Sequence, residues 1–179
     1  MNNNIITYTG KIIDIFNFKE ENIDIVDIAA SLSKQCRFGG HCREFYSVAQ
    51  HSANVVKLVD PKYKLHALLH DASEAYLVDV PRPVKNSEQF TFYRELENNI
   101  MNIIYKKFNI EISNEEIKQA DDSMLVLEQY ELMVNHKDMK DFNEEKVLKE
   151  LTIFPLWAPK ESQERFLNLF YYLINNNFL

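Results

Sequence analysis

Histidine and aspartate side chains at three places in the chain have the types and the order needed to bind a divalent metal ion. His70 and Asp71 are adjacent in the segment Leu-Leu-His-Asp-Ala-Ser-Glu-Ala. His51 lies upstream in Val-Ala-Gln-His-Ser-Ala, and Asp121 lies downstream after Lys-Gln-Ala. Two imidazole nitrogens and two carboxylates form a suitable ligand set, and an ion with an open coordination position can activate water. If these four side chains converge, the protein is a hydrolase.

Each of these residues has a simpler explanation when it is taken alone. A single histidine on an amphipathic helix more often satisfies a hydrogen bond in the core than binds a metal. A further histidine, His66, has the same ambiguity. It lies one turn before His70, so it could border the site or simply be packed in the core. The spacing of these two histidines is also that of zinc proteases, but Ala67 stands where those enzymes need a glutamate. The order His, His-Asp, Asp on helical segments is what favours a site.

The bulk composition predicts one mostly helical domain over residues 1–179. The chain is 46% hydrophobic and 26% charged, which is typical of a globular protein. It contains only three glycines and five prolines, which favours long helices with short connections over a β-sandwich or barrel. We therefore expect an all-α protein, with residues 1–20 as an N-terminal arm, 24–135 as the core and 143–179 as C-terminal helices.

The net charge of −7 disfavours binding to duplex nucleic acid through its phosphates. A small anion needs only a local positive cluster, and residues 28–43 contain no acid but include Lys34, Arg37 and Arg43. Cys36 and Cys42 are expected to be reduced thiols in a cytoplasmic protein. The first residues lack a signal-peptide core, and no apolar run approaches the ~18 residues of a membrane span.

Hydrophobic periodicity locates the elements that must position the candidate residues. Residues 7–15 predict a β-hairpin around Gly10. The helical pattern then covers residues 24–35, 47–58, 88–108 and 159–175, with a weaker helix over 143–151. A helix from Pro61 places His66, His70 and Glu74 at four-residue spacing on one side.

Two further segments carry turn and capping signals. The two prolines in Val-Pro-Arg-Pro-Val predict a loop over residues 80–84. Residues 113–116 form a capping-box pattern that begins a helix extending to about residue 135 and carrying Asp121. The prediction is six or seven helices with almost no sheet.

Several of these segments resemble the HD-domain metal-dependent phosphohydrolases, closest to single-domain members similar to 5′-deoxynucleotidases. The resemblance covers residues 24–132. The motifs are Cys-Arg-Phe-Gly-Gly-His (36–41), Tyr-Ser-Val-Ala-Gln-His-Ser (46–52), His-Asp-Ala-Ser-Glu-Ala-Tyr (70–76), Asp-Val-Pro-Arg-Pro-Val-Lys (79–85) and Gln-Ala-Asp (119–121). The block over 70–85 is the most specific of them.

The resemblance implies a single compact HD-domain bundle with one divalent ion (Mn, Co, Fe, Mg or Zn). It assigns the ion to His51, His70, Asp71 and Asp121. Asp122 follows directly, so either aspartate could be the ligand, and the motif register favours Asp121. His136 is the only downstream histidine that could serve a second ion, so one ion is expected.

The same resemblance implies roles for residues around the ion. Glu74 would orient or deprotonate the attacking water, and Asp79 would face the sugar or protonate the leaving group. Arg37 corresponds to a phosphate-contacting arginine, which suits an anion through its two-pronged geometry. Phe38 stands where an aromatic lies beside the sugar. Two more contacts stay open: Lys85 could touch phosphate or be a solvated loop residue, and His41 could touch substrate or close its loop.

The expected activity is release of phosphate from nucleoside or deoxynucleoside 5′-monophosphates by attack of metal-bound water. One alternative is cleavage of phosphodiesters or pyrophosphates, such as cyclic nucleotides or guanosine tetraphosphate. Another is a non-catalytic regulator that uses the metal only to bind a nucleotide. The expected partner is a small nucleotide, with no duplex nucleic acid and no membrane, and the apolar run over 166–174 indicates a homodimer contact.

Overall fold

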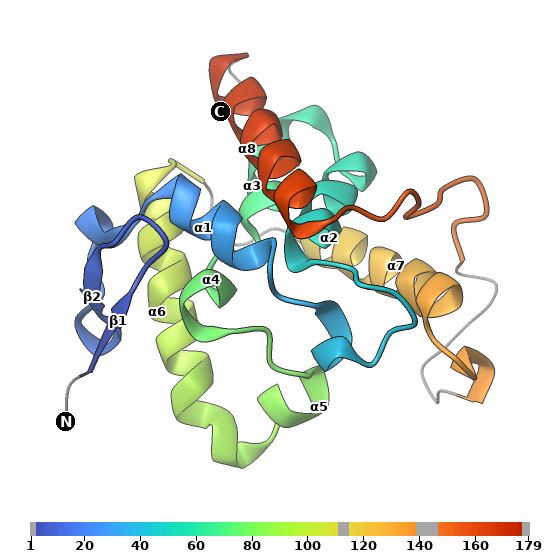
Figure 1. The fold of residues 1–179 in the computed structure, drawn as a ribbon, viewed down its shortest axis with the longest axis horizontal. Helices are drawn as coiled ribbons and strands as arrows, with labels where there is room; N and C mark the ends of the chain where they lie inside the picture. Colours follow the sequence, from blue (N-terminus) through green and yellow to red (C-terminus); the bar gives the residue numbers. More distant parts are fainter. Residues whose placement is uncertain (1–2, 111–114, 139–146, 177–179) are drawn as a thin grey trace.

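The computed structural model describes residues 3–110, 115–138 and 147–176. This part of the chain is mostly helical with a small antiparallel hairpin, which confirms the predicted fold class (Figure 1). The strands and helices, in chain order, are β1 (Asn4–Ile6), β2 (Ile12–Asp14), α1 (Ile25–Leu32), α2 (Val48–Val55), α3 (Lys64–Leu69), α4 (Glu74–Leu77), α5 (Arg82–Lys85), α6 (Thr91–Lys107), α7 (Glu115–Leu132) and α8 (Pro159–Asn175).

The predicted hairpin forms around Gly10, but its first strand lies before the predicted range 7–15. Strands β1 and β2 pair antiparallel, and Gly10 in the connecting turn has a φ of 88°, a conformation that glycine adopts without strain. Ile13 on β2 is fully buried. The buried carboxylate of Asp27 in α1 accepts hydrogen bonds from the backbone N–H (2.6 Å) and the hydroxyl (2.9 Å) of Thr9. These bonds attach the turn of the hairpin to α1.

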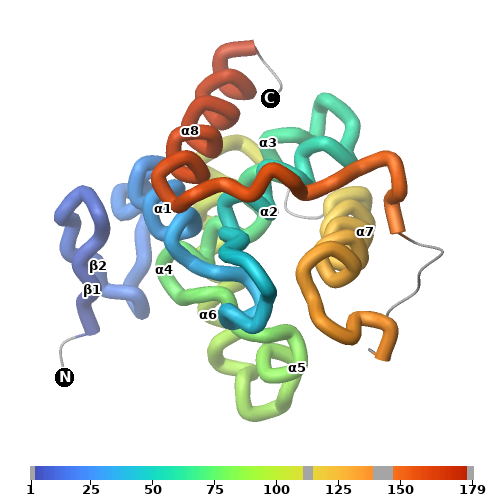
Figure 2. The backbone as a smooth tube through the Cα atoms, turned by 45° about the vertical axis from the view of Figure 1, so that its right-hand side comes forward, coloured from blue at the N-terminus to red at the C-terminus, as the bar shows by residue number. Residues whose placement is uncertain are grey.

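Helix α2 is the central element of the molecule. It packs against α1, α3, α7 and α8, and Figure 2 shows it surrounded by these helices. All eight of its residues are buried although half of them are polar. Most of the polar groups are paired: the Gln50 amide donates to the carbonyls of Ile153 (3.0 Å) and Pro155 (2.9 Å), and Asn54 donates to the Tyr46 hydroxyl (3.0 Å). The Oδ1 atom of Asn54 is buried with no partner among the described residues. Paired groups of this kind make a buried polar helix tolerable.

The helix predicted after Pro61 is interrupted within the His-Asp-Ala-Ser-Glu-Ala-Tyr motif (70–76). Helix α3 ends at Leu69, residues 70–73 form turns, and α4 begins at Glu74. The backbone bonds here join residues three apart, as in the bond from the Glu74 N–H to the Asp71 carbonyl (3.0 Å). This tighter winding displaces Glu74 from the four-residue row. The prediction of one continuous helix was therefore wrong, and Glu74 sits on a separate short helix.

The predicted loop over 80–84 instead contains the short helix α5. Pro81 precedes this helix, and its carbonyl accepts bonds from the N–H groups of Val84 (2.8 Å) and Lys85 (3.0 Å). Proline is tolerated in a first helical turn because no N–H is needed there. The two prolines therefore begin a helix rather than exclude one, and α5 places Arg82 and Lys85 beside the candidate site.

The remaining helices follow the predictions with shifted ends. Helices α6 and α8 agree with their predicted ranges, and α7 ends at Leu132. The proposed capping residues 113 and 114 lie outside the described residues, as does the first part of the predicted helix over 143–151. The described part of that segment, 147–151, is not helical.

Helix α8 explains the apolar run near the end of the chain. Phe166, Phe170 and Leu173 are buried, and the helix lies against α1, α2 and α3. Tyr171 and Tyr172 remain about half exposed, at 48% and 57%. Most of this run is therefore core, and a homodimer contact stays a prediction. Among the described helices, none has the length and apolar character that crossing a membrane requires.

Candidate metal centre

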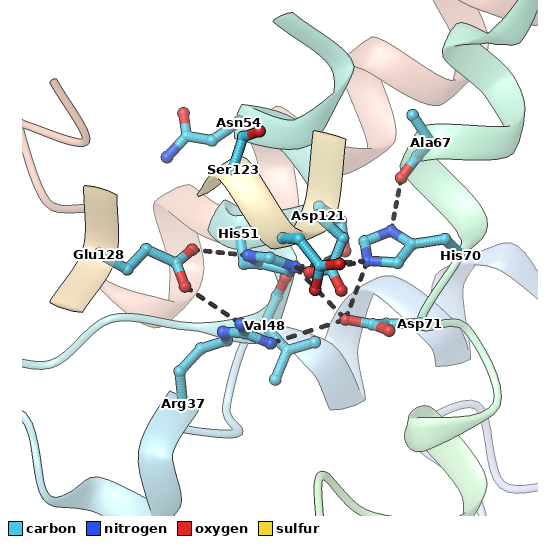
Figure 3. Close-up of polar contacts among 12 residues, drawn as sticks. Arg37, Val48, His51, Asn54, Ala67, His70, Asp71, Asp121, Ser123 and Glu128 are labelled. Carbon is cyan, nitrogen blue, oxygen red and sulfur yellow. Dashed lines mark hydrogen bonds and ion pairs between the residues drawn. The ribbon is translucent and has the colours of Figure 1, made fainter. Parts of the chain in front are cut away.

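Side chains from α2, from the turn after α3 and from α7 converge on one point (Figure 3). The Nε2 atom of His51 lies 3.3 Å from Nε2 of His70 and 3.1 Å from Oδ1 of Asp121. The same Asp121 oxygen lies 3.8 Å from Nε2 of His70. One ligand atom from each residue lies within 4.8 Å of the others, so this buried cluster could hold a metal ion.

The two remaining predicted acidic ligands behave differently. Asp71 Oδ2 lies 3.3 Å from the Nε2 atom of His70 and 3.6 Å from that of His51, so it borders the cluster. Asp122 points away: its Oδ1 pairs with Arg82 at 2.8 Å, and its side chain is 48% exposed. The structure therefore places Asp121 rather than Asp122 in the cluster.

Both imidazoles are held so that Nε2 faces the centre. Nδ1 of His70 lies 2.8 Å from the carbonyl of Ala67, and Nδ1 of His51 lies 2.6 Å from Oε1 of Glu128. A hydrogen bond at one ring nitrogen fixes the tautomer that leaves the other free to bind a metal. Two nitrogens at zinc–nitrogen distances in a tetrahedral site are about 3.4 Å apart, and the observed 3.3 Å fits this geometry.

The charges in the cluster favour a cation. Burial lowers the pKa of His70, but Asp71 and Asp121 outweigh this effect and raise it to about 9. Burial and Arg37 likewise oppose protonation of His51, yet the nearby carboxylates raise its pKa above 6.5. Burial would raise the pKa of Asp121, and its bonds to the two histidines hold it far below the ordinary value. A divalent cation would displace the ring protons and take up the same negative charge.

Glu128 on α7 is a functional candidate that sequence reasoning missed. It is fully buried, with Oε1 on His51 and Oε2 at 3.0 Å from Nη2 of Arg37. Burial would raise the pKa of Glu128, but the charges of Arg37 and His51 outweigh this effect and lower it. One signal was available: Glu128 follows Asp121 by two helical turns, a spacing that places both on one face of the helix.

A cavity of about 760 Å³ opens beside the cluster. This volume lies within the range of about 300–1,000 Å³ that is common for small-molecule sites. Its lining includes the predicted residues Arg37, Phe38, Asp71, Glu74, Asp79, Lys85 and Asp121. Apolar side chains, including Leu125 and Met133, form another part of the wall. The cavity therefore offers both charged groups and an apolar surface to a ligand.

Glu74 and Asp79 are acidic residues of this lining whose environments favour proton uptake. Burial, followed by the charges of Asp71 and Asp79, raises the pKa of Glu74 well above its ordinary value. Its Oε2 is buried and has no hydrogen-bond partner among the described residues. Burial also raises the pKa of Asp79, and its backbone N–H is held by the Gln35 side chain at 2.9 Å.

The predicted substrate contacts are divided between the cavity and the surface. Lys85 is neither solvated nor free, because its Nζ lies 2.7 Å from Glu97 and 3.5 Å from Glu74. Phe38 lines the cavity with a φ of 57°, a left-handed backbone that tightens the loop after Arg37. His41 is exposed, and the cavity lining in the described part of the chain does not include it. For His41, both the contact to substrate and the loop-closing role stay predictions.

His66 lies apart from the cluster and packs in the core. Its Nε2 is 3.1 Å from the Tyr105 hydroxyl, and the rings meet edge to face. Burial, and then the nearby charge of His70, lowers the pKa of His66 to about 4. Of the two alternatives left by the sequence, the structure therefore supports a packed histidine that stays neutral.

This neutral histidine predicts a pH dependence of stability. Below about pH 6.5 the unfolded chain protonates His66, whereas the folded chain does so only near pH 4. The free energy of unfolding should therefore fall as the pH drops through this window, by up to about 1.4 kcal/mol per pH unit from this group. Urea titrations at several pH values should show a shallower dependence for His66→Gln than for the wild type.

The matched control is Tyr105→Phe, which removes the hydroxyl but keeps the imidazole buried. We expect a similar loss of stability at every pH with the wild-type slope retained, because burial is the main cause of the shift. Equal slopes for the wild type and His66→Gln would contradict a neutral His66.

Together these features define a helical protein with a candidate divalent-metal centre at the wall of a cavity. No model of a known protein family matches the chain. The chain is 39% identical over 127 residues to the uncharacterized protein YfdR of Escherichia coli K12, and the match covers 70% of each chain. It is also 32% identical over 111 residues to the uncharacterized protein RCAP_rcc00048 of Rhodobacter capsulatus, which is 57% of this chain and 56% of the relative. The chain belongs to the family of YfdR.

Proposed function

We propose that the protein is a metal-dependent phosphohydrolase of the HD-domain type that releases phosphate from nucleoside or deoxynucleoside 5′-monophosphates. One divalent ion would be held by His51, His70, Asp71 and Asp121. When bound, such an ion lowers the pKa of water from 15.7 to about 7 and offsets the negative charge of a phosphate. The observation that carries the proposal is one cavity whose lining includes Asp121 of the cluster together with Asp71, Glu74 and Arg37.

Glu74 is the proposed proton acceptor for the attacking water. Glu74 lines the cavity, and its buried Oε2 has no hydrogen-bond partner among the described residues, so this oxygen remains available as a proton acceptor. Lys85 lies 3.5 Å from the other oxygen and fixes the carboxylate from that side. The raised pKa brings a carboxylate closer to the neutral range in which a general base works best.

Arg37 is the proposed contact to the phosphate. Glu128 and Asp71 face its two terminal nitrogens, at 3.0 and 3.7 Å. Arg37 lines the cavity, and its Nε is buried and has no partner among the described residues. A fixed guanidinium of this kind stabilises charge that develops during phosphoryl transfer without reorganising.

Asp79 is the proposed proton donor to the leaving oxygen, and Phe38 is the proposed contact to the sugar. Burial raises the pKa of Asp79, which favours the protonated form that a donor requires. Asp79 and Phe38 both line the cavity that contains Glu74. The cavity thus supplies an acceptor, a donor and an anion contact, which phosphate ester hydrolysis needs.

The proposal is tested by measuring phosphate release with manganese, cobalt, magnesium, zinc or iron(II) against ribo- and deoxyribonucleoside 5′-monophosphates. Cyclic nucleotides and guanosine tetraphosphate serve as comparison substrates, and His70→Ala is the control protein. We expect turnover of monophosphates by the wild type alone. Turnover of the cyclic nucleotides or guanosine tetraphosphate alone would mean that the substrates are phosphodiesters or pyrophosphates rather than monophosphates. Intact nucleotide bound in calorimetry with no hydrolysis under any metal would instead indicate a binding protein.

A further inference from the structure

Glu128 is a buried carboxylate whose two oxygens serve two different partners. Oε1 lies 2.6 Å from Nδ1 of His51, and Oε2 lies 3.0 Å from Nη2 of Arg37. Figure 3 shows the carboxylate between the imidazole and the guanidinium, on the side of His51 away from His70. The side chain is fully buried, so water cannot replace either contact.

The two partners belong to different parts of the proposed reaction. His51 turns its Nε2 toward the candidate metal centre, where it lies 3.1 Å from Asp121. Arg37 lines the cavity that would receive the phosphate, and its buried Nε has no partner among the described residues. Because a carboxylate is rigid and planar, fixing one oxygen on His51 also fixes where the other can meet Arg37.

We propose that Glu128 is a positioning residue that holds the metal ligand His51 and the anion contact Arg37 in a fixed relation. The inference deepens the proposed function and rests on it for the role of Arg37. Helix α7 supplies this geometry because it carries both Asp121, which belongs to the cluster, and Glu128, which acts through His51. Helix α7 therefore sets the position of Asp121, of the His51 ring and of Arg37.

A purely structural role would make a different prediction. If Glu128 only neutralised Arg37, a neutral replacement would affect protein stability and the Arg37 contact but not metal affinity. If it positions both partners, the replacement affects metal affinity as well, because the His51 ring loses its acceptor. Groups that hydrogen-bond to a metal ligand typically contribute about 10- to 100-fold in metal affinity or activity.

The test compares Glu128→Gln with Glu131→Gln in the full-length protein. An amide oxygen can accept from His51 or from Arg37, but the amide nitrogen then faces the other donor. Glu131 lies on the same helix and accepts only a backbone N–H, that of Ile153 at 2.8 Å, among the bonds described for it. Its amide can still accept that bond, so Glu131→Gln controls for loss of one charge from α7.

Three quantities are measured: manganese affinity by competition with a chelator, the Nδ1 proton resonance of His51 in zinc-loaded protein, and kcat and KM for a nucleoside monophosphate. For Glu128→Gln we expect about 10- to 100-fold weaker metal binding, an upfield shift of the His51 proton and a raised KM. Arg37→Gln should raise KM while leaving metal affinity close to the wild type. Glu131→Gln should match the wild type throughout.

Unchanged metal affinity and an unchanged His51 resonance in Glu128→Gln would overturn the inference. If Glu128→Gln does not fold, Glu128→Asp is used instead, because it keeps the charge but shortens the side chain. For this variant too, unchanged metal affinity and an unchanged His51 resonance would overturn the inference, and a loss of both would support it. If the wild type binds metal but hydrolyses no phosphate ester, the proposed function fails. The metal-affinity and resonance measurements still decide whether Glu128 positions His51 in that case.

Discussion

Replacing Glu74 by glutamine is expected to lower kcat by about 10²- to 10⁴-fold, the usual contribution of a general base, with metal binding retained. Glutamine has nearly the same shape but cannot take a proton from water. Glu74 does not belong to the cluster of His51, His70 and Asp121, so the replacement leaves the candidate metal ligands unchanged. Phosphate release and metal content should be measured on the same purified protein.

Glu97→Gln is the matched control for this prediction. Glu97 is the other carboxylate on Lys85, at 2.7 Å, and its loss changes the charge around that lysine without altering Glu74, which lines the cavity. We expect nearly wild-type kcat for Glu97→Gln. Equal losses in the two variants would mean that Glu74 acts only by holding Lys85, and an unchanged kcat in Glu74→Gln would remove it from the reaction.

The sequence predicted well those features that depend on neighbours along the chain. The strand signal around Gly10 indicated a hairpin but not its first strand, Asn4–Ile6, and periodic apolar positions were enough for α6 and α8. The candidate ligands were named from their residue types and order, and the resemblance then assigned the ion to them. Spacing along one helix says nothing about which distant helices meet. The convergence of His51, His70 and Asp121 is therefore information that only the fold supplies.

The features that the sequence did not reveal depend on three-dimensional neighbours. Residues 70–73 wind more tightly than the four-residue pattern implied, and this moves Glu74 to a new helix. Lys85 was uncertain because its partner Glu97 lies on another helix. Glu128 was missed because a glutamate on an amphipathic helix is ordinarily a surface charge, and only packing against α2 buries it beside His51.

The Asp121→Asn replacement is expected to lower metal affinity more than any single replacement outside the proposed ligands. Asp121 Oδ1 is 3.1 Å from Nε2 of His51, so the Asp121→Asn variant replaces a charged oxygen of the cluster by a neutral one. The loss of metal affinity should exceed the about 10- to 100-fold typical of residues that only hydrogen-bond to a ligand. Phosphate release should fall with it, and both are measured at saturating substrate over a range of metal concentrations.

Asp122→Asn separates a ligand role from a general loss of negative charge on α7. Arg82 bridges the two residues, with 3.1 Å to Asp121 Oδ2 and 2.8 Å to Asp122 Oδ1. Each replacement therefore removes one bond to the same 54%-exposed arginine, and an exposed ion pair contributes little to stability. Because only Asp121 has its other oxygen among the imidazoles, Asp122→Asn should keep metal affinity and turnover. The reverse pattern would move the ligand to Asp122 and require α7 to turn relative to α2.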